Sequence, residues 1–188
     1  YKSNKMTNEL WKNSIIDLIY GYKKKHFSPY EVAKETINNI NKLNSKLNAF
    51  VHFDEADVLE QATLSTSRYV KNNMIGPLDG IPVSIKDLII TKNLPTTRGS
   101  FISSLPINSD LDAPVVKRLK ENGAVILGKT ASPEFGHKGT TQSLRFGNTN
   151  NPWNLSLNSG GSSGGAAAAV AAGMGPAAIG TDGGGSIR

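Results

Sequence analysis

The residues best suited to chemistry lie in two loops of small residues. One reads Gly-Gly-Ser-Ser-Gly-Gly over residues 160–165, and the other places Ser186 directly after the three glycines at 183–185. Taken alone, about half of such Gly/Ser tracts are flexible linkers. Here residues 166–172 are strong helix formers and residues 177–180 can form a short strand, so each loop adjoins a regular element. Glycine-rich loops in such positions expose successive backbone N–H groups, which suits a phosphate or an oxyanion.

The neighbouring residues favour an oxyanion over a phosphate. The string Gly-x-x-x-x-Gly-Lys-Ser/Thr, which a P-loop requires, does not occur in the sequence. The loop at 160–165 also lacks the preceding strand and the later acidic residue of a dinucleotide-binding fingerprint. An oxyanion hole needs a nucleophile beside its N–H donors, and Ser186 has that position. The pattern therefore indicates a serine nucleophile, and we expect no cofactor.

A serine nucleophile requires a general base, and Lys86 is a better candidate than any histidine. The histidines are His26, His52 and His137. The first two lie in a helical N-terminal part, and the third lies in a loop without a well-placed carboxylate. Lys86 lies in an apolar stretch, residues 81–88, that predicts a buried strand. Burial would lower the lysine pKa from ~10.4 toward ~7–8, so that a neutral amine can accept a proton. The plainer alternative is a lysine at a strand end paired with Asp87.

Three segments together resemble the amidase signature family. They are Gly-Ile-Pro-Val-Ser-Ile-Lys-Asp at 80–87, the Gly/Ser loop at 160–165, and Gly-Thr-Asp-Gly-Gly-Gly-Ser-Ile-Arg at 180–188. Stretches at 128–130, 133–135 and 146–153 are also similar, and the similarity runs from about residue 28 to the last residue. The resemblance implies an α/β fold with helices around a mixed twisted β-sheet, which this chain builds only in part.

The resemblance also implies a Ser–cisSer–Lys triad. Ser186 would be the nucleophile that accepts the acyl group, Ser162 the bridging serine after a cis peptide bond, and Lys86 the terminal base. The separation of the two serines, 186 − 162 = 24 residues, agrees with that of the family. Residues 134–139 would border the acyl pocket. The oxyanion hole would consist of the backbone amides of Gly183, Gly184, Gly185 and Ser186.

The function implied is an amidase that hydrolyses the carboxamide C–N bond of a small-molecule substrate through an acyl-enzyme on Ser186. One alternative is the glutamine-hydrolysing subunit of an amidotransferase, which works in an assembly with partner proteins. Residues 133–138 are more similar to general amidases than to such subunits. Another alternative is a catalytically silent scaffold. Because family enzymes are considerably longer, we expect a fragment, with the remainder of the chain missing and its own activity in doubt.

The elements that must position these residues fall into two regions. We interpret residues 1–6 as tag or upstream residues, residues 7–71 as an N-terminal helical region, and residues 72–188 as the N-terminal portion of the amidase signature domain. In the helical region, Ser28 with Pro29 and Glu31 has the pattern of a capping box at the start of a helix.

The remaining elements alternate between strand and helix. A short strand is predicted at 47–53 and a helix at 54–69. A buried strand at 80–88, a helix at 113–122 and a second strand at 124–127 follow. This strand–helix–strand spacing is typical of parallel pairing in an α/β structure.

Composition excludes several classes of site and partner. The 188 residues carry 21 Lys and Arg against 15 Asp and Glu, a net charge of +6, and contain no cysteine. A cysteine-ligated metal is thereby excluded, and three scattered histidines predict no metal site. The positive charge is concentrated in residues 1–25, so we expect no nucleic-acid partner. Without an apolar run of ~18–20 residues we expect no membrane span, and without a visible signal peptide we expect a cytoplasmic protein. Exposed strand edges would favour a homo-oligomer if no other chain completes the sheet.

Overall fold

The computed structural model describes residues 9–102 and 108–188. The interpretation of residues 1–6 as a tag lies outside these residues. The helices are α1 (Ile15–Lys24), α2 (Pro29–Leu47), α3 (Glu55–Val70), α4 (Pro114–Glu121) and α5 (Gly164–Ala171), with short 3-10 helices η1 (Leu10–Lys12) and η2 (Glu134–Gly136). The strands are β1 (Phe50–Phe53), β2 (Pro82–Lys86), β3 (Val125–Thr130), β4 (Gln142–Ser143), β5 (Gly147–Asn148), β6 (Asn150–Asn151), β7 (Asn154–Asn158) and β8 (Ala177–Ile179).

A mixed four-stranded sheet forms the centre of the structure. Its strand order is β1-β3-β2-β8. Strand β2 pairs in parallel with β3 and with β8, whereas β1 runs antiparallel to β3. The parallel pair β2–β3 enclosing α4 is the unit that the strand–helix–strand spacing predicted. The α/β fold with helices around a mixed sheet is therefore confirmed.

Local sequence signals determine where the N-terminal helices begin. The Ser28 hydroxyl accepts a hydrogen bond from the Glu31 amide, and the Glu31 carboxylate accepts one from the Ser28 amide, so the predicted capping box is present. Pro29 occupies the first turn, where its missing N–H costs nothing. Asp54 caps α3 by accepting from the amides of Ala56 and Asp57. These caps satisfy N–H groups that a helix start leaves unpaired.

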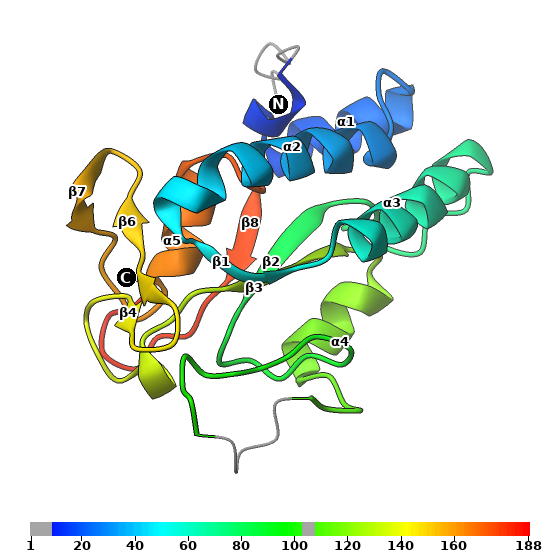
Figure 1. Ribbon diagram of the computed structural model, residues 1–188. Coiled ribbons are helices and arrows are strands. Elements are labelled where there is room, and N and C mark those ends of the chain that lie inside the picture. The colour runs from blue at the N-terminus through cyan, green and yellow to red at the C-terminus, as the bar shows by residue number, and fades with distance from the viewer. Residues whose placement is uncertain (1–8, 103–107) are drawn as a thin grey trace.

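Two buried apolar clusters hold the helices on the sheet. Side chains from α2, α3, β3 and α5 share one cluster, which includes Leu127. A second cluster joins α1, α4, β2 and β3 and includes Ile85 and Ile126. The alternation of Ile126 and Leu127 between the clusters places them on opposite faces of β3. Figure 1 shows α1 and α2 above the strands and α4 below them.

The first cluster includes residues on both sides of position 71, since it combines α2 and α3 with β3 and α5. The division of the chain into 7–71 and 72–188 stays a prediction. Strands β2 and β8 pair with each other and both contact α5. This matters for the site because each of these three elements carries or adjoins a residue of the predicted triad.

Candidate active site

The three side chains predicted to form a triad lie in one hydrogen-bonded line. Lys86 Nζ lies 2.7 Å from Ser162 Oγ, and Ser162 Oγ lies 2.9 Å from Ser186 Oγ. Lys86 is the last residue of β2, whereas Ser162 precedes α5 and Ser186 follows β8. The parallel pairing of β2 with β8 brings the ends of these two strands together. Lys86 and Ser162 are 76 positions apart in the chain, and Ser162 and Ser186 are 24 positions apart, yet each pair lies within hydrogen-bonding distance.

Lys86 has no exposed surface and makes three hydrogen bonds to hydroxyl oxygens. Besides Ser162, its Nζ contacts Ser163 Oγ at 3.0 Å and Thr181 Oγ1 at 2.9 Å. Burial lowers the pKa of Lys86 to about 8, and the carboxylate of Asp182 opposes part of that shift. An amine with this pKa is partly neutral near physiological pH, which is a condition for accepting a proton.

The surrounding hydroxyls orient a neutral Lys86. The Ser163 hydroxyl donates to the Thr181 carbonyl oxygen at 3.0 Å, so its hydrogen is already used and its oxygen can only accept from Lys86. Among the described residues the Thr181 hydroxyl has Lys86 as its partner. A neutral amine has two N–H donors and one lone pair. If Ser163 and Thr181 accept both hydrogens of the neutral amine, its lone pair is left for Ser162.

The glycines around Ser162 allow close contacts between backbone segments. A Cβ at position 161 would lie 2.8 Å from the Thr140 carbonyl carbon, and one at position 165 would lie 2.4 Å from the Ala131 amide nitrogen. Gly165 N also donates to the Ala131 carbonyl oxygen at 3.2 Å. The Gly161–Ser162 peptide bond is cis, as the resemblance implied. Gly165 therefore packs against the backbone that follows β3, and Gly161 packs against the backbone of residues 139–140.

Asp182 organises the loop that carries Ser186. Its carboxylate accepts from the amides of Gly185, Ile187 and Arg188 at 2.6–3.1 Å and pairs with the Arg188 guanidinium at 2.9 Å. The Arg188 guanidinium is the largest cause holding the pKa of Asp182 well below its usual range. The Gly185 amide is thus engaged, which differs from the expectation that all four amides serve one oxyanion. Within the described chain, the amides of Gly183, Gly184 and Ser186 have no hydrogen-bond partner.

A cavity of about 250 Å³ lies beside Ser186. Its lining is formed mainly by small residues of α5 and β8: Ser163, Ala166, Ala167, Val170, Ala178, Gly180, Ser186 and Ile187. On another side, η2 approaches Ser162, since a Cβ at Gly136 would lie 3.6 Å from Ser162 Oγ. Ser186 thus lines a cavity of small side chains, while its partner Ser162 lies near η2.

Comparison with known proteins establishes the family. A model of the family described as Amidase matches residues 31–188. The chain belongs to the amidase signature family. An acylamidase of Rhodococcus erythropolis is 42% identical over 163 residues, which are 87% of this chain and 34% of that protein. A glutamyl-tRNA(Gln) amidotransferase subunit of Alkaliphilus metalliredigens is 41% identical over 175 residues, 93% of this chain and 35% of that protein.

Solved structures of amidase signature proteins have the same fold. A bacterial aryl acylamidase of the family superposes with a TM-score of 0.86 at 37% identity, covering 95% of this chain and 37% of that one. A crystal structure described as an amidase gives a TM-score of 0.88 at 33% identity, with coverages of 93% and 40%. The chain spans about a third of the length of the curated relatives it matches.

Sequence reasoning missed Ser163, Thr181 and Lys129. Ser163 and Thr181 contact Lys86. The available signal was their position in the chain: Ser163 follows Ser162, and Thr181 lies just after a short strand. Asp87 does not pair with Lys86 but accepts from the Thr97 and Gly99 amides instead. Lys129 is a second fully buried lysine, which its apolar strand could have indicated.

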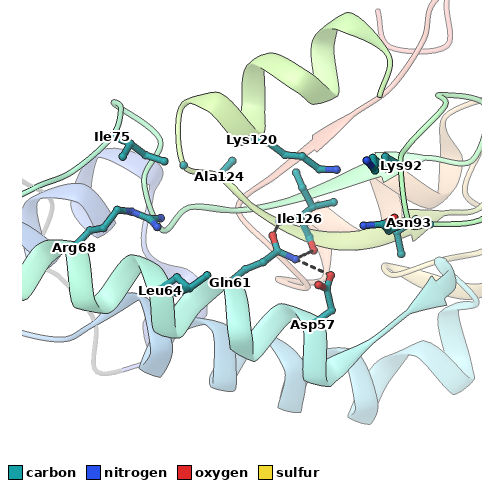
Figure 2. A pocket seen from close by; sticks show the side chains of 12 residues that line it. Asp57, Gln61, Leu64, Arg68, Ile75, Lys92, Asn93, Lys120, Ala124 and Ile126 are labelled. Carbon is teal, nitrogen blue, oxygen red and sulfur yellow. Dashed lines mark hydrogen bonds between the residues drawn. The ribbon is translucent and has the colours of Figure 1, made fainter. Parts of the chain in front are cut away.

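A further pocket lies away from Lys86, Ser162 and Ser186. The pocket has a volume of about 300 Å³ and lies between α3, α4 and the start of β3. Figure 2 shows side chains that line it. There the Gln61 side chain accepts from the Ile126 amide at 2.8 Å and donates to the Ile126 carbonyl oxygen at 3.3 Å. Gln61 thus covers the part of β3 that β1 leaves unpaired, because β1 pairs only from Gly128 onward. The basic side chains of this pocket include Arg68 and Lys120, both of which have acidic partners.

The described part of the chain contains neither a cluster of metal ligands nor a membrane-spanning helix. In residues 9–102 and 108–188, no group of three or more His, Asp or Glu side chains could hold a metal ion. Over the same residues, none of the helices has both the length and the apolar character needed to cross a membrane.

Proposed function

We propose that this protein is an amidase that hydrolyses a carboxamide C–N bond of a small-molecule substrate through an acyl-enzyme on Ser186. The observation that carries the proposal is the line from Lys86 Nζ through Ser162 Oγ to Ser186 Oγ, with links of 2.7 and 2.9 Å. Membership of the amidase signature family supports it, as does the similarity to an acylamidase.

In the acylation step, Ser186 Oγ attacks the carbonyl carbon of the amide. Its proton passes to Ser162 Oγ while Ser162 passes its own proton to the Lys86 amine, which becomes an ammonium. The new C–O bond converts the carbonyl oxygen into an oxyanion. The C–N bond then breaks, and the departing nitrogen takes a proton back along the same line. The products of this half are a free amine and an ester on Ser186.

In the deacylation step, water replaces the amine. It gives a proton to the line of hydroxyls as its oxygen attacks the ester carbonyl, and Ser186 recovers a proton as the ester bond breaks. The carboxylic acid leaves and Lys86 returns to its neutral form. The balance is one amide and one water for one carboxylic acid and one amine.

The oxyanion would be stabilised by the amides of Gly183, Gly184 and Ser186. These three have no partner among the described residues, whereas Gly185 N–H donates to Asp182. Such donors act where negative charge develops, and the loss of one typically costs ~3–4 kcal/mol of transition-state stabilisation. Gly185 would join this set only if its bond to Asp182 were broken.

Labelling with a fluorophosphonate tests the proposal in the full-length protein. We expect modification of Ser186, identified by peptide mass spectrometry, and loss of labelling in Lys86→Ala. Lys34→Ala is the control, since Lys34 is exposed on α2 and lies outside the hydrogen-bonded line. An unlabelled wild-type protein that is folded would instead favour a catalytically silent scaffold.

A second candidate is the glutamine-hydrolysing component of an amidotransferase. It is favoured by 41% identity to a glutamyl-tRNA(Gln) amidotransferase subunit. For this function we expect ammonia from glutamine and co-purification of partner proteins from the native host. For an independent amidase we expect hydrolysis of anilides without partners. Parallel assays of ammonia from glutamine and of aniline from an acyl anilide distinguish the two.

A further inference from the structure

Two buried residues of opposite charge hold the segment 89–99, which follows β2. Neither Asp87 nor Lys129 has exposed surface. Lys129 Nζ donates to three oxygens of the segment, Ile89 O at 2.5 Å, Thr91 Oγ1 at 3.1 Å and Thr96 Oγ1 at 2.8 Å. All three hydrogens of an ammonium group are thus matched to acceptors within residues 89–96.

Asp87 holds the other end of the same segment. Its carboxylate accepts from the Thr97 amide at 2.9 Å, the Thr97 hydroxyl at 2.5 Å and the Gly99 amide at 3.2 Å. Its backbone carbonyl accepts from the Arg98 amide at 3.0 Å. Four hydrogen bonds to one residue therefore hold residues 97–99 against Asp87.

Residues 97–100 in turn hold η2. The Phe135 amide donates to the Arg98 carbonyl oxygen at 2.8 Å, and the Ser100 hydroxyl donates to Glu134 Oε1 at 2.6 Å. The backbone at Gly99 is close enough to Ser132 that a Cβ there would lie 2.7 Å from the Ser132 carbonyl oxygen. These contacts place η2 in a defined position relative to the 97–100 turn.

The position of η2 matters because this short helix adjoins the triad. A Cβ at Gly136 would lie 3.6 Å from Ser162 Oγ, and Phe135 presents a side chain that is 44% exposed. Asp87 itself makes no hydrogen bond to Lys86, Ser162 or Ser186 within the described residues. The contacts of its carboxylate lead instead to the turn at 97–100 and from there to η2.

We propose that Asp87 is a positioning residue that, through residues 97–99 and the Arg98 carbonyl, fixes η2 beside Ser162 and so decides which acyl groups fit next to Ser186. The inference rests on the proposed amidase function. It assigns Asp87 to the selection of the acyl group rather than to proton transfer, although it directly follows the proposed base in the chain.

Asp79 provides a matched control for the structural role of a buried carboxylate. It is also fully buried, and it accepts from Ser65 Oγ, the Arg68 guanidinium and the Ile75 amide at 2.6–3.0 Å. Those partners belong to α3 and to the chain before β2, away from η2. An Asp79→Asn variant therefore reports what the loss of a buried carboxylate does to folding alone.

The test compares two probes in the full-length protein. Second-order rate constants for labelling Ser186 are measured with a small ethyl fluorophosphonate and with a bulky aryl fluorophosphonate, whose substituents take the place of the acyl group. The variants are Asp87→Asn and the milder Thr97→Val, which removes a hydroxyl that donates to Asp87 and accepts from the Gly99 amide. The ratio of the two rate constants is independent of the fraction of folded protein.

We expect the ratio to change roughly tenfold in the Asp87 and Thr97 variants, the scale on which pockets discriminate small differences in substrate size. The ratio should stay at its wild-type value in Asp79→Asn. Equal losses with both probes, leaving the ratio unchanged in Thr97→Val and in Asp87→Asn, would overturn the inference. Should Asp87→Asn fail to fold, Thr97→Val decides alone. A folded wild-type protein that neither probe labels contradicts the amidase function itself, which separates the two failures.

Discussion

Lys86 and Lys129 lie on neighbouring parallel strands with no exposed surface, and their side chains leave the sheet on opposite faces. The register pairs Ile85 with Lys129, so these two share a face, and Lys86 must point to the other. Lys86 meets the hydroxyls of Ser162, Ser163 and Thr181. Lys129 meets the segment 89–99. Burial lowers the pKa of each to about 8, but only Lys86 is in contact with a serine in line with Ser186.

Labelling of Ser186 should therefore increase with pH and level off above the pKa of Lys86. The base must be neutral, and a lowered lysine pKa means that the neutral form accumulates as pH rises through about 8. Below that value, each pH unit should reduce the labelling rate roughly tenfold. The measurement is a pH–rate profile between pH 6 and 10.

Lys129→Met is the control for this profile. Because Lys129 lies on the opposite face of the sheet, the midpoint of the profile should stay near that of the wild type, even if the plateau labelling rate changes. A midpoint that moves with Lys129, or a flat wild-type profile, contradicts the assignment of Lys86 as the base.

Thr181→Val should lower the plateau of the labelling rate roughly tenfold, as expected when a hydrogen bond to a reacting group is lost. Removal of the hydroxyl leaves one hydrogen of the neutral Lys86 amine without its acceptor, so the lone pair is held less well toward Ser162. The matched variant is Thr63→Val on α3, whose hydroxyl donates to the Leu59 carbonyl oxygen one turn earlier in the same helix. Equal rates for the two variants would remove Thr181 from the site.

Asp182→Ala should impair labelling more than Arg188→Met. The first change removes the acceptor for the amides of Gly185, Ile187 and Arg188, whereas the second removes only the guanidinium and leaves those three bonds in place. The measurement is the labelling rate of Ser186 in each variant at pH 9. A greater loss in Arg188→Met would mean that the ion pair, not the carboxylate-to-amide bonds, shapes the loop.

The Asp182 contacts should also persist under mild acid. The pKa of this carboxyl is lowered in the folded protein, so its stabilising contribution is complete above the unfolded value of 3.8 and is lost only as pH falls further. Between pH 7 and 5, the decline in labelling should therefore follow Lys86 alone, with the same slope in Arg188→Met.

Gly165→Ala should destabilise the fold by about 1–3 kcal/mol, the range for overpacking a close-packed site. An added methyl group would lie 2.4–2.8 Å from backbone atoms of Ala131 and Ala49, and these atoms cannot rotate away. Gly139→Ala is the control, because no heavy atom lies within 4 Å of a Cβ there. Urea unfolding midpoints of the two variants provide the comparison, and equal midpoints would contradict the packing argument.

Elements with strong local signals were predictable from the sequence. The capping box at Ser28 locates the start of α2, and the apolar run before Lys86 locates β2. Element boundaries that depend on contacts outside the element differ from the predicted ones. Strand β1 begins at Phe50 rather than residue 47 because the Asn44 side chain accepts from the amides of Ala49 and Phe50. Helix α5 begins at Gly164, inside the Gly/Ser loop, where the Gly164 amide donates to the Thr141 hydroxyl.

The sequence by itself determined which residues could react: two serines in glycine-rich loops and a lysine in an apolar strand, since these follow from residue type and neighbours. Only the tertiary structure decided how they meet. The pairing of β2 with β8 joins Lys86 to residues 76 to 95 positions later. It also decided that Thr181 rather than Asp87 contacts Lys86, and that Gly185 gives its amide to Asp182. Such contacts depend on strand register and loop geometry, which no local pattern encodes.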